Sequence, residues 1–114
     1  MSDVRAWLGR SVEIQIDRPL GSCHPQHGFL YPLNYGFLPG VMGKDGEALD
    51  AYLLGVFEPV KQAQGIVIAV IERLNDSDDK LVVAPPGKRY TADQITALVE
   101  FQERFFESQI TLMD

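Results

Sequence analysis

The sequence contains little sulfur and no long apolar run. Cys23 is its single cysteine, so the chain cannot form an internal disulfide, and we expect a reducing, cytoplasmic environment. No basic leader followed by an apolar stretch opens the sequence, and no apolar run reaches the length of a membrane span. These absences predict a cytoplasmic protein with no membrane partner.

Positive charge is also scarce. The 10 Lys and Arg residues are outnumbered by 16 Asp and Glu residues, which gives a formal net charge of −6. Because nucleic-acid phosphates bind basic surfaces, this balance argues against a nucleic-acid partner. It does not argue against a small anionic substrate, since bound divalent cations can reverse the local sign of charge.

Several familiar catalytic motifs are missing. The sequence has no Walker-type phosphate loop, no dinucleotide fingerprint, no serine-hydrolase elbow and no EF-hand loop. Cys23 lacks the surroundings of a nucleophile, because only the adjacent His24 is near it in sequence. Apolar residues nevertheless make up 46% of the chain, which is typical of a folded protein, and the length predicts a single domain over 1–114.

The pattern of apolar residues predicts a strand-rich body followed by a helix. We expect a short helix over 2–9, an irregular aromatic and Gly/Pro-rich loop over 29–44, and a helix over 91–109 that a TADQ capping box begins. The predicted strands cover 11–17, 51–56, 65–74 and 80–85. The fold class is therefore mainly β with flanking helices (α+β), a small closed or half-closed barrel with the late helix packed against it.

The segment DGEALD places three carboxylates, Asp45, Glu47 and Asp50, within six residues. Gly46 permits a sharp backbone turn between the first two. A cluster of oxygen ligands without sulfur suits a hard cation such as Mg²⁺, with Mn²⁺ as a substitute. A solvated turn explains this hexapeptide equally well, because Asp, Gly and Glu are common in turns.

A second acidic segment, NDSDDK, contains Asp76, Asp78 and Asp79 and ends in Lys80. A polar turn between two apolar strands is the simplest interpretation of it alone. Two acidic turns in one small domain favour a shared metal site, in which Lys80 would hold a phosphate oxygen.

The HPQH segment contributes two histidines, His24 and His27, in a proline-containing loop. Their spacing is a weak signal for a transition metal, and turn histidines usually face solvent. Contact with an anion is the more specific functional hypothesis, because an imidazole N–H is a suitable donor to phosphate.

The segment YPLNYGF, followed after seven residues by DGEALD, resembles the soluble family I inorganic pyrophosphatases. The family hallmark is Tyr-Pro-x-Asn-Tyr-Gly leading at this spacing to Asp-Gly-Asp-Pro-x-Asp. IDRPLGS and NDSDDKLVVAP resemble two further family segments, so the likeness covers roughly residues 12–85 and, more loosely, the terminal FFE. The resemblance implies a small closed barrel of the OB type and Mg²⁺-dependent hydrolysis of pyrophosphate, with a homo-oligomeric assembly.

The resemblance also implies roles for individual residues. Glu47 matches the aspartate that helps to deprotonate the attacking water, Asp50 matches a bridge between metal ions, and Tyr35 and Lys80 match groups that contact phosphate. The implied catalytic residues are Glu47, Asp50, Lys80 and Tyr35, and the implied metal ligands are Asp45, Glu47, Asp50, Asp78, Asp17 and Asp76.

The sequence departs from the family on the side that grips phosphate. Glu47 and Ala48 stand in place of Asp and Pro, and Asn75 stands about where a metal-binding aspartate is expected. A hairpin carrying a lysine and an arginine is reduced to CHPQHGFL, and a Tyr-Lys pair is absent after FFE. The candidate replacement groups for substrate binding are Arg18, His24, His27 and Lys88, beside Tyr35 and Lys80.

These observations favour a Mg²⁺-dependent inorganic pyrophosphatase whose substrate is a small molecule. Two alternatives stay open. The protein can be a metal-dependent hydrolase of another phosphoanhydride or phosphate ester, or a non-catalytic relative that binds metal or phosphate.

Overall fold

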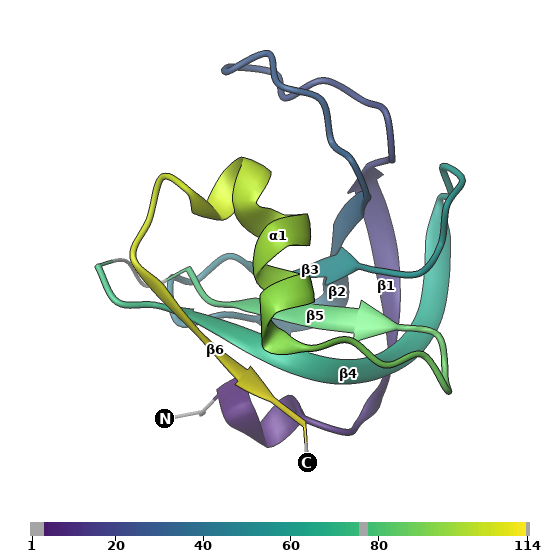
Figure 1. Cartoon of the computed structure of the whole chain (residues 1–114), viewed down its shortest axis with the longest axis vertical. Helices are drawn as coiled ribbons and strands as arrows, with labels where there is room; N and C mark the ends of the chain where they lie inside the picture. The colour runs from purple at the N-terminus through teal and green to yellow at the C-terminus, as the bar shows by residue number, and fades with distance from the viewer. Residues whose placement is uncertain (1–3, 76–77, 114) are drawn as a thin grey trace.

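The computed structural model describes residues 4–75 and 78–113 and contains a sheet that curves into a barrel (Figure 1). Asp76, a predicted metal ligand, lies outside the described residues. The elements in chain order are η1 (Val4–Trp7), β1 (Ser11–Arg18), β2 (Asn34–Met42), β3 (Ala48–Leu53), β4 (Gln62–Arg73), β5 (Lys80–Ala84), α1 (Ala92–Glu103) and β6 (Ser108–Leu112). No helix in the described part of the chain is long and apolar enough to cross a membrane.

The barrel closes because β1 pairs with two strands. The sheet order is β1-β2-β3-β5-β4-β6, and β1 also pairs antiparallel with β4 from Ser11↔Ile66 to Gln15↔Gln62. β3 and β5 are parallel, whereas the other pairs are antiparallel. Among the described strands, β1 to β5 form the closed barrel and β6 extends the sheet beyond β4. The prediction of a closed barrel with a C-terminal helix is confirmed.

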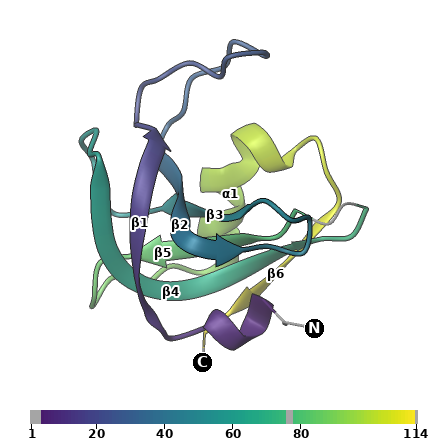
Figure 2. The ribbon, with the colours of Figure 1, turned by 180° about the vertical axis from the view of Figure 1, so that it is seen from behind.

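The central strands are buried on both faces, which explains their continuous apolar runs. Successive side chains of a strand point to opposite faces. On β3, Ala51 and Leu53 join the cluster inside the barrel, whereas Tyr52 joins the cluster beneath α1. Figures 1 and 2 show α1 lying across the outer face of the barrel near β3 and β5. β1 differs, because Val12 and Ile14 are buried whereas Glu13 and Gln15 on its other face are exposed.

The prediction of an irregular loop over 29–44 is wrong for its second half. Residues Asn34–Met42 form β2, which pairs with both β1 and β3. The pairing with β3 is irregular between Phe37 and Met42, where Pro39 and Gly40 lie. Gly and Pro disfavour a strand locally, but the neighbouring strands hold this segment extended on both sides.

The predicted helix over 91–109 begins correctly but ends early. Thr91 caps α1 through the predicted capping box, and the helix ends at Glu103. Ser108–Leu112 instead form β6, which pairs with the open edge of β4 from Arg73↔Ser108 to Ala69↔Leu112. The apolar spacing that included Phe105 and Phe106 is therefore not helical, and Phe105 is exposed.

The N-terminal segment is a single 3-10 turn within the described residues, shorter than the helix predicted over 2–9. Val4 is buried, and Trp7 and Leu8 pack against the cluster inside the barrel. The predicted cap, Ser2, lies outside the described part of the chain. This turn closes one end of the barrel, away from the site described next.

Candidate active site

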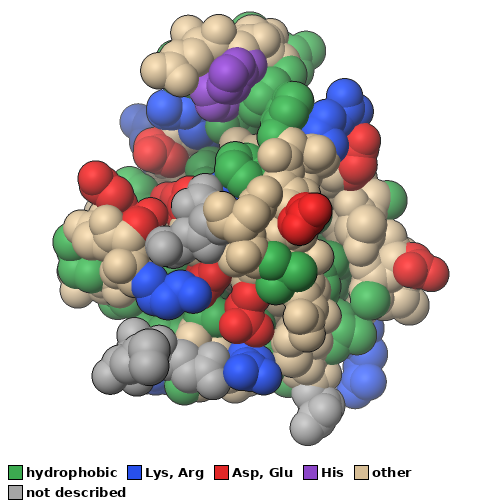
Figure 3. All heavy atoms as spheres, turned by 90° about the vertical axis from the view of Figure 1, so that its left-hand side faces the viewer, with side chains coloured by type: hydrophobic (Ala, Val, Ile, Leu, Met, Phe, Trp, Pro, Cys, Tyr) green, Lys and Arg blue, Asp and Glu red, His purple; other side chains and the backbone are tan. Residues whose placement is uncertain are grey.

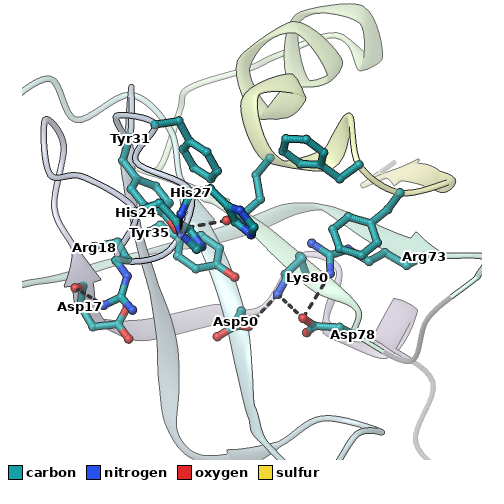
Figure 4. Close-up of a pocket in the computed structure, with 14 residues that line it drawn as sticks. Asp17, Arg18, His24, His27, Tyr31, Tyr35, Asp50, Arg73, Asp78 and Lys80 are labelled. Atoms are coloured by element: carbon teal, nitrogen blue, oxygen red, sulfur yellow. Dashed lines mark hydrogen bonds and ion pairs between the residues drawn. The ribbon is translucent and has the colours of Figure 1, made fainter.

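A cleft of about 500 Å³ lies on the outer face of the barrel, beside the C-terminal end of α1, where Gln102, Phe105 and Phe106 line it. Its floor comes from β2, β3, β4 and β5, and one wall comes from the long β1–β2 connection. The charged residues that line it are Asp17, Arg18, Asp50, Arg73, Asp78 and Lys80. Figure 4 shows these side chains facing a common space.

Strand alternation explains why these charges meet. Asp50 pairs with Lys80 across the parallel β3–β5 ladder, and both share the face of Tyr52 and Val82 beneath α1. Arg73 is two residues after Ile71, which pairs with Lys80 on the opposite side. Three neighbouring strands therefore present Asp50, Lys80 and Arg73 on one face.

Lys80 lies between two carboxylates at the centre of the cleft. Its Nζ donates to Oδ2 of Asp50 at 2.7 Å and to Oδ2 of Asp78 at 2.8 Å (Figure 4). The Lys80 side chain is 2% exposed, whereas both aspartate side chains are 29% exposed. The carboxylates consequently remain accessible from the cleft, while the ammonium group is fixed beneath them.

Burial raises the pKa of two cleft carboxylates, Asp78 and Asp17, by more than their cationic neighbours lower it. Desolvation raises the pKa of Asp78, although the hydrogen bond and charge of Lys80 partly oppose the shift. Desolvation also raises the pKa of Asp17, with Arg18 opposing it, even though Asp17 is at the exposed rim. A cation bound between these groups would relieve this cost.

Tyr35 extends from β2 toward the same carboxylates. Burial, followed by the charge of Asp50, raises the pKa of Tyr35 well above that of a free phenol. The phenol is therefore neutral and remains a hydrogen-bond donor at physiological pH. Its ring lies 5.5 Å from Lys80 Nζ.

Two residues of the YPLNYGF segment, Asn34 and Gly36, have structural roles. Asn34 is fully buried; its Oδ1 accepts from the Leu20 amide at 3.0 Å and its Nδ2 donates to the Glu58 carbonyl at 3.0 Å. It thereby ties the β1–β2 and β3–β4 connections together. Gly36 is required because a Cβ there would lie 1.8 Å from the Gln15 carbonyl oxygen.

The connection between β1 and β2 folds back on itself above the cleft. An isolated bridge joins Cys23 to Leu30, and HPQH forms the tip. The His24 Nδ1 accepts from the amides of Gln26 and His27, each at 3.1 Å. Desolvation, followed by the charges of His27 and Arg18, lowers the pKa of His24. Figure 3 shows the two histidines above a face where acidic and basic side chains lie together.

Aromatic side chains connect this loop to the end of α1. Phe29 lies 5.7 Å from Phe101 and 6.4 Å from Phe105, measured between ring centroids. Tyr31 donates from its hydroxyl to Gln102 Oε1 at 3.1 Å. The β1–β2 connection is thus held over the cleft by ring contacts and by one long-range hydrogen bond.

Two predicted site residues lie outside this cleft. Asp45 and Glu47 are exposed in the β2–β3 turn, where the Glu47 amide donates to Asp45 Oδ1 at 3.0 Å. Gly46 has a φ of +81° there, as expected for the tight turn. The hexapeptide thus separates in space: Asp50 lines the cleft, and the first two carboxylates face solvent.

Lys88 also lies apart from the other candidates. It lines a second cleft with Tyr90 and Met113, near the start of α1. The structure therefore brings together Asp17, Arg18, His24, His27, Tyr35, Asp50, Asp78 and Lys80, and it does not bring Lys88 to them.

Arg73 lines the cleft although no motif of the sequence indicated it. Its side chain is 4% exposed; Nε and Nη2 donate to Glu103 Oε1 and Oε2 at 3.1 and 2.9 Å, and Nη1 donates to Asp78 Oδ2 at 3.2 Å. Arg73 is the last residue of the apolar strand β4. The indication in the sequence was an arginine at the end of the mostly apolar segment GIVIAVIER. Only the pairing of β4 with β5 places it beside Asp78.

The donor set fits a hard divalent cation. Asp50 Oδ2 and Asp78 Oδ2 both accept from Lys80 Nζ, so the two carboxylates lie side by side in the cleft that Asp17 also lines. Within residues 4–75 and 78–113, no three His, Cys, Asp or Glu side chains are preassembled as ligands. Carboxylate oxygens are nevertheless the ligands that Mg²⁺ and Mn²⁺ prefer.

Comparison with known proteins identifies relatives of the whole barrel. Residues 11–111 match the family described as inorganic pyrophosphatase. The inorganic pyrophosphatase of Haemophilus influenzae is 35% identical over 103 residues, covering 82% of this chain and 53% of that protein. That of Neisseria meningitidis serogroup A is 30% identical over 110 residues, covering 89% and 56%. The chain spans about half the length of these curated relatives.

Solved structures share the fold at lower sequence identity. The inorganic pyrophosphatase of Ehrlichia chaffeensis superposes with a TM-score of 0.73 at 15% identity, covering 93% of this chain and 88% of that one. The enzyme of Neisseria gonorrhoeae gives a TM-score of 0.60 at 20% identity, covering 93% and 82%. The solved structures show the shared fold, and the match over residues 11–111 shows that the chain belongs to the family I inorganic pyrophosphatases.

Proposed function

We propose that this protein hydrolyses inorganic pyrophosphate to two phosphates with Mg²⁺ as the cofactor. One observation supports the proposal most strongly: Asp50 and Asp78 converge on Lys80 at the centre of a cleft. This arrangement combines ligands for a divalent cation with an ammonium group for phosphate, which phosphoryl transfer requires. The family membership and the names of the curated relatives agree with it.

Asp50, Asp78 and Asp17 are the proposed metal ligands within the cleft. A bound Mg²⁺ would neutralise phosphate charge and lower the pKa of a water molecule. Asp76 remains a proposed ligand outside the described residues, and Asp45 remains one in the exposed turn. Mn²⁺ prefers the same ligands and is expected to substitute.

Other side chains of the cleft are proposed to bind and orient the phosphates. Lys80 and Arg18 supply positive charge, and Tyr35 supplies a neutral O–H donor. The His24 Nδ1 is occupied by two backbone amides, so the neutral ring carries its proton on Nε2 and donates from there. His27 lines the cleft beside it, and Lys88 stays a proposal for a substrate that extends beyond the cleft.

Glu47 is proposed as the base that orients and deprotonates the attacking water. Its carboxylate is exposed in the β2–β3 turn, three residues before Asp50. It reaches water in the cleft only if that turn moves toward Asp50. The side chain is one methylene longer than aspartate, which extends its reach.

Substituting Asp50 tests the proposal directly. Asp50→Asn removes one charged oxygen ligand while preserving the size of a side chain within β3, so we expect hydrolysis to fall about a hundredfold or more with the fold intact. Phosphate release from pyrophosphate is measured with Mg²⁺, with Mn²⁺ and with a chelator. Glu13→Gln, an exposed carboxylate on β1, is the matched control and should retain wild-type activity. An Asp50→Asn variant with near-wild-type turnover would exclude this centre.

A nucleotide phosphoanhydride is the second candidate substrate. The aromatic side chains of Phe29, Tyr31 and Phe105 line the cleft beside its charged floor, and aromatic faces suit a nucleobase. A panel of pyrophosphate, nucleoside triphosphates and phosphomonoesters distinguishes the substrates. Preference for a nucleotide would favour this candidate, whereas no turnover with Mg²⁺ binding retained would identify a non-catalytic relative.

We further propose a cytoplasmic, homo-oligomeric protein.

A further inference from the structure

Arg73 lies in the cleft on the side opposite Arg18, at the end of β4 (Figure 4). Neither the composition nor the motifs of the sequence pointed to it. The phosphates of any substrate in this cleft face the carboxylates of Asp17, Asp50 and Asp78, so fixed positive charge on the cleft wall is needed to hold them. Arg73 and Lys80 supply that charge from adjacent strands.

Two contacts fix the guanidinium group in place. Nε and Nη2 donate to both carboxylate oxygens of Glu103, in the parallel geometry that suits arginine and carboxylate. The ring of Phe106 lies 3.6 Å from Arg73 Cζ, so the planar group is also stacked. Glu103 is positioned in turn by the Tyr52 hydroxyl, which donates to Oε2 at 2.6 Å. The cation is therefore preorganised before any substrate binds.

The remaining nitrogen, Nη1, faces the cleft carboxylate. It donates to Asp78 Oδ2 at 3.2 Å, which is longer than the bonds from Nε and Nη2 to Glu103. That same oxygen also accepts from Lys80 Nζ at 2.8 Å. An oxygen shared between two cations binds each less strongly, so the Nη1 contact is the one that a phosphate oxygen can most readily replace.

We propose that Arg73 is a phosphate-binding residue of this cleft, held by Glu103 and Phe106 and presenting Nη1 to the substrate. The inference rests on the proposed function, because it assigns Arg73 to the same phosphoanhydride site. The chain has few positive charges, and this role uses an arginine at the end of β4 that also holds α1 through Glu103. Arginine suits this role better than lysine because its planar donors match the geometry of phosphate oxygens.

Binding of a non-hydrolysable analogue tests the role without relying on turnover. Methylenediphosphonate, a pyrophosphate analogue with a carbon bridge, is titrated by calorimetry in the presence of Mg²⁺. Arg73→Met should weaken its binding about ten- to hundredfold, as expected for losing one charge-assisted contact. Arg73→Lys should be intermediate. Arg104→Met removes an exposed arginine that pairs with Glu100 and should bind like the wild type.

A double variant separates phosphate binding from support of the fold. Arg73→Met alone leaves Glu103 buried without its cation, so the variant is expected to lose thermal stability. Arg73→Met with Glu103→Gln removes both charges and keeps an acceptor for Tyr52, so melting temperature should largely recover while affinity for the analogue stays low. If the double variant binds the analogue like the wild type, the proposal is overturned.

The wild-type protein distinguishes this failure from failure of the proposed function. Wild-type protein that neither binds the analogue nor hydrolyses pyrophosphate with Mg²⁺ or Mn²⁺ would overturn the proposed function, and the assignment of Arg73 with it. Wild-type binding and turnover, combined with unchanged affinity in the double variant, would overturn the role of Arg73 alone.

Discussion

At the scale of residues, the cleft depends on cations shared between carboxylates. Lys80 contacts Asp50 and Asp78, and Arg73 contacts Asp78 and Glu103. Each cation is nearly inaccessible, whereas Asp50 and Asp78 retain access to the cleft. The buried positive charges therefore hold the acidic oxygens in place, and under the proposed function they would also attract the phosphates of a substrate.

Removing the cation between the two aspartates should couple stability to Mg²⁺. Lys80→Met leaves Asp50 and Asp78 close together without compensation, so we expect a loss of about 1–3 kcal/mol in the free energy of unfolding with a chelator present. Mg²⁺ should raise the melting temperature of this variant more than that of the wild type, because it replaces the lost charge. Lys61→Met, at an exposed lysine, is the control. Equal Mg²⁺-induced shifts in both proteins would show that Asp50 and Asp78 are not cation ligands.

Acidification should loosen the tip of the β1–β2 connection through His24. The pKa of His24 is lowered below its ordinary value of 6.5, so the charged ring is disfavoured in the fold. Its stabilising contribution is thus present above pH 6.5 and is lost as the pH falls through the lower folded-state pKa. Protonation at Nδ1 breaks the bonds from the amides of Gln26 and His27.

Nuclear magnetic resonance measures this titration. The His24 ring should titrate below pH 6.5, and the amide signals of Gln26 and His27 should shift with the same midpoint. A His24 ring that titrates above 6.5, or amide signals that ignore its titration, would contradict the hydrogen bonds described for this loop.

At the scale of elements, α1 and β6 show where local pattern and fold agree and where they disagree. The capping box was predictable, because Thr91 and Gln94 exchange two hydrogen bonds at 2.8 and 3.1 Å within one turn. The end of α1 was not predictable, because the apolar side chains of Phe105 and Phe106 continue a helical spacing. Ser108–Leu112 form a strand because they pair with the free edge of β4. The turn between α1 and this strand places Phe106 against Arg73.

Removing the cap should destabilise the helix that carries Glu103. Thr91→Ala deletes the side chain that accepts from the Gln94 amide, and we expect a loss of about 1 kcal/mol in the free energy of unfolding. Thr96→Ala, an exposed position within the same helix, should change stability by less than about 0.5 kcal/mol. Denaturant unfolding measures both variants, and equal losses would argue against a specific role for the cap.

At the scale of the whole molecule, closure of the barrel creates the site. β1 pairs with both β2 and β4, so the chain encloses one apolar cluster and leaves a second one for α1 to cover. The cleft lies where the outer face emerges beyond the end of α1 and where the β1–β2 connection returns over it. The chain achieves this arrangement while spanning about half the length of its curated relatives.

The family, the closed barrel and most of the charged residues of the cleft could be predicted from the sequence alone. YPLNYGF and DGEALD contain residues whose roles are local or dictated by alternation: Gly36 permits close strand approach, Gly46 permits the turn, and Asp50 begins a face that continues through Tyr52. Apolar runs located β3, β4 and β5 because both faces of these strands are buried.

Which charged side chains come into contact depends on the three-dimensional packing of the elements. Asp45 and Glu47 are close to Asp50 in sequence, yet the turn leaves them exposed, whereas Arg73 and Glu103 are 30 residues apart and share two hydrogen bonds. Lys88 lies in a separate cleft because it belongs to the loop between β5 and α1. Strand register and the packing of α1 set these distances, and the spacing of residues along the chain predicts neither.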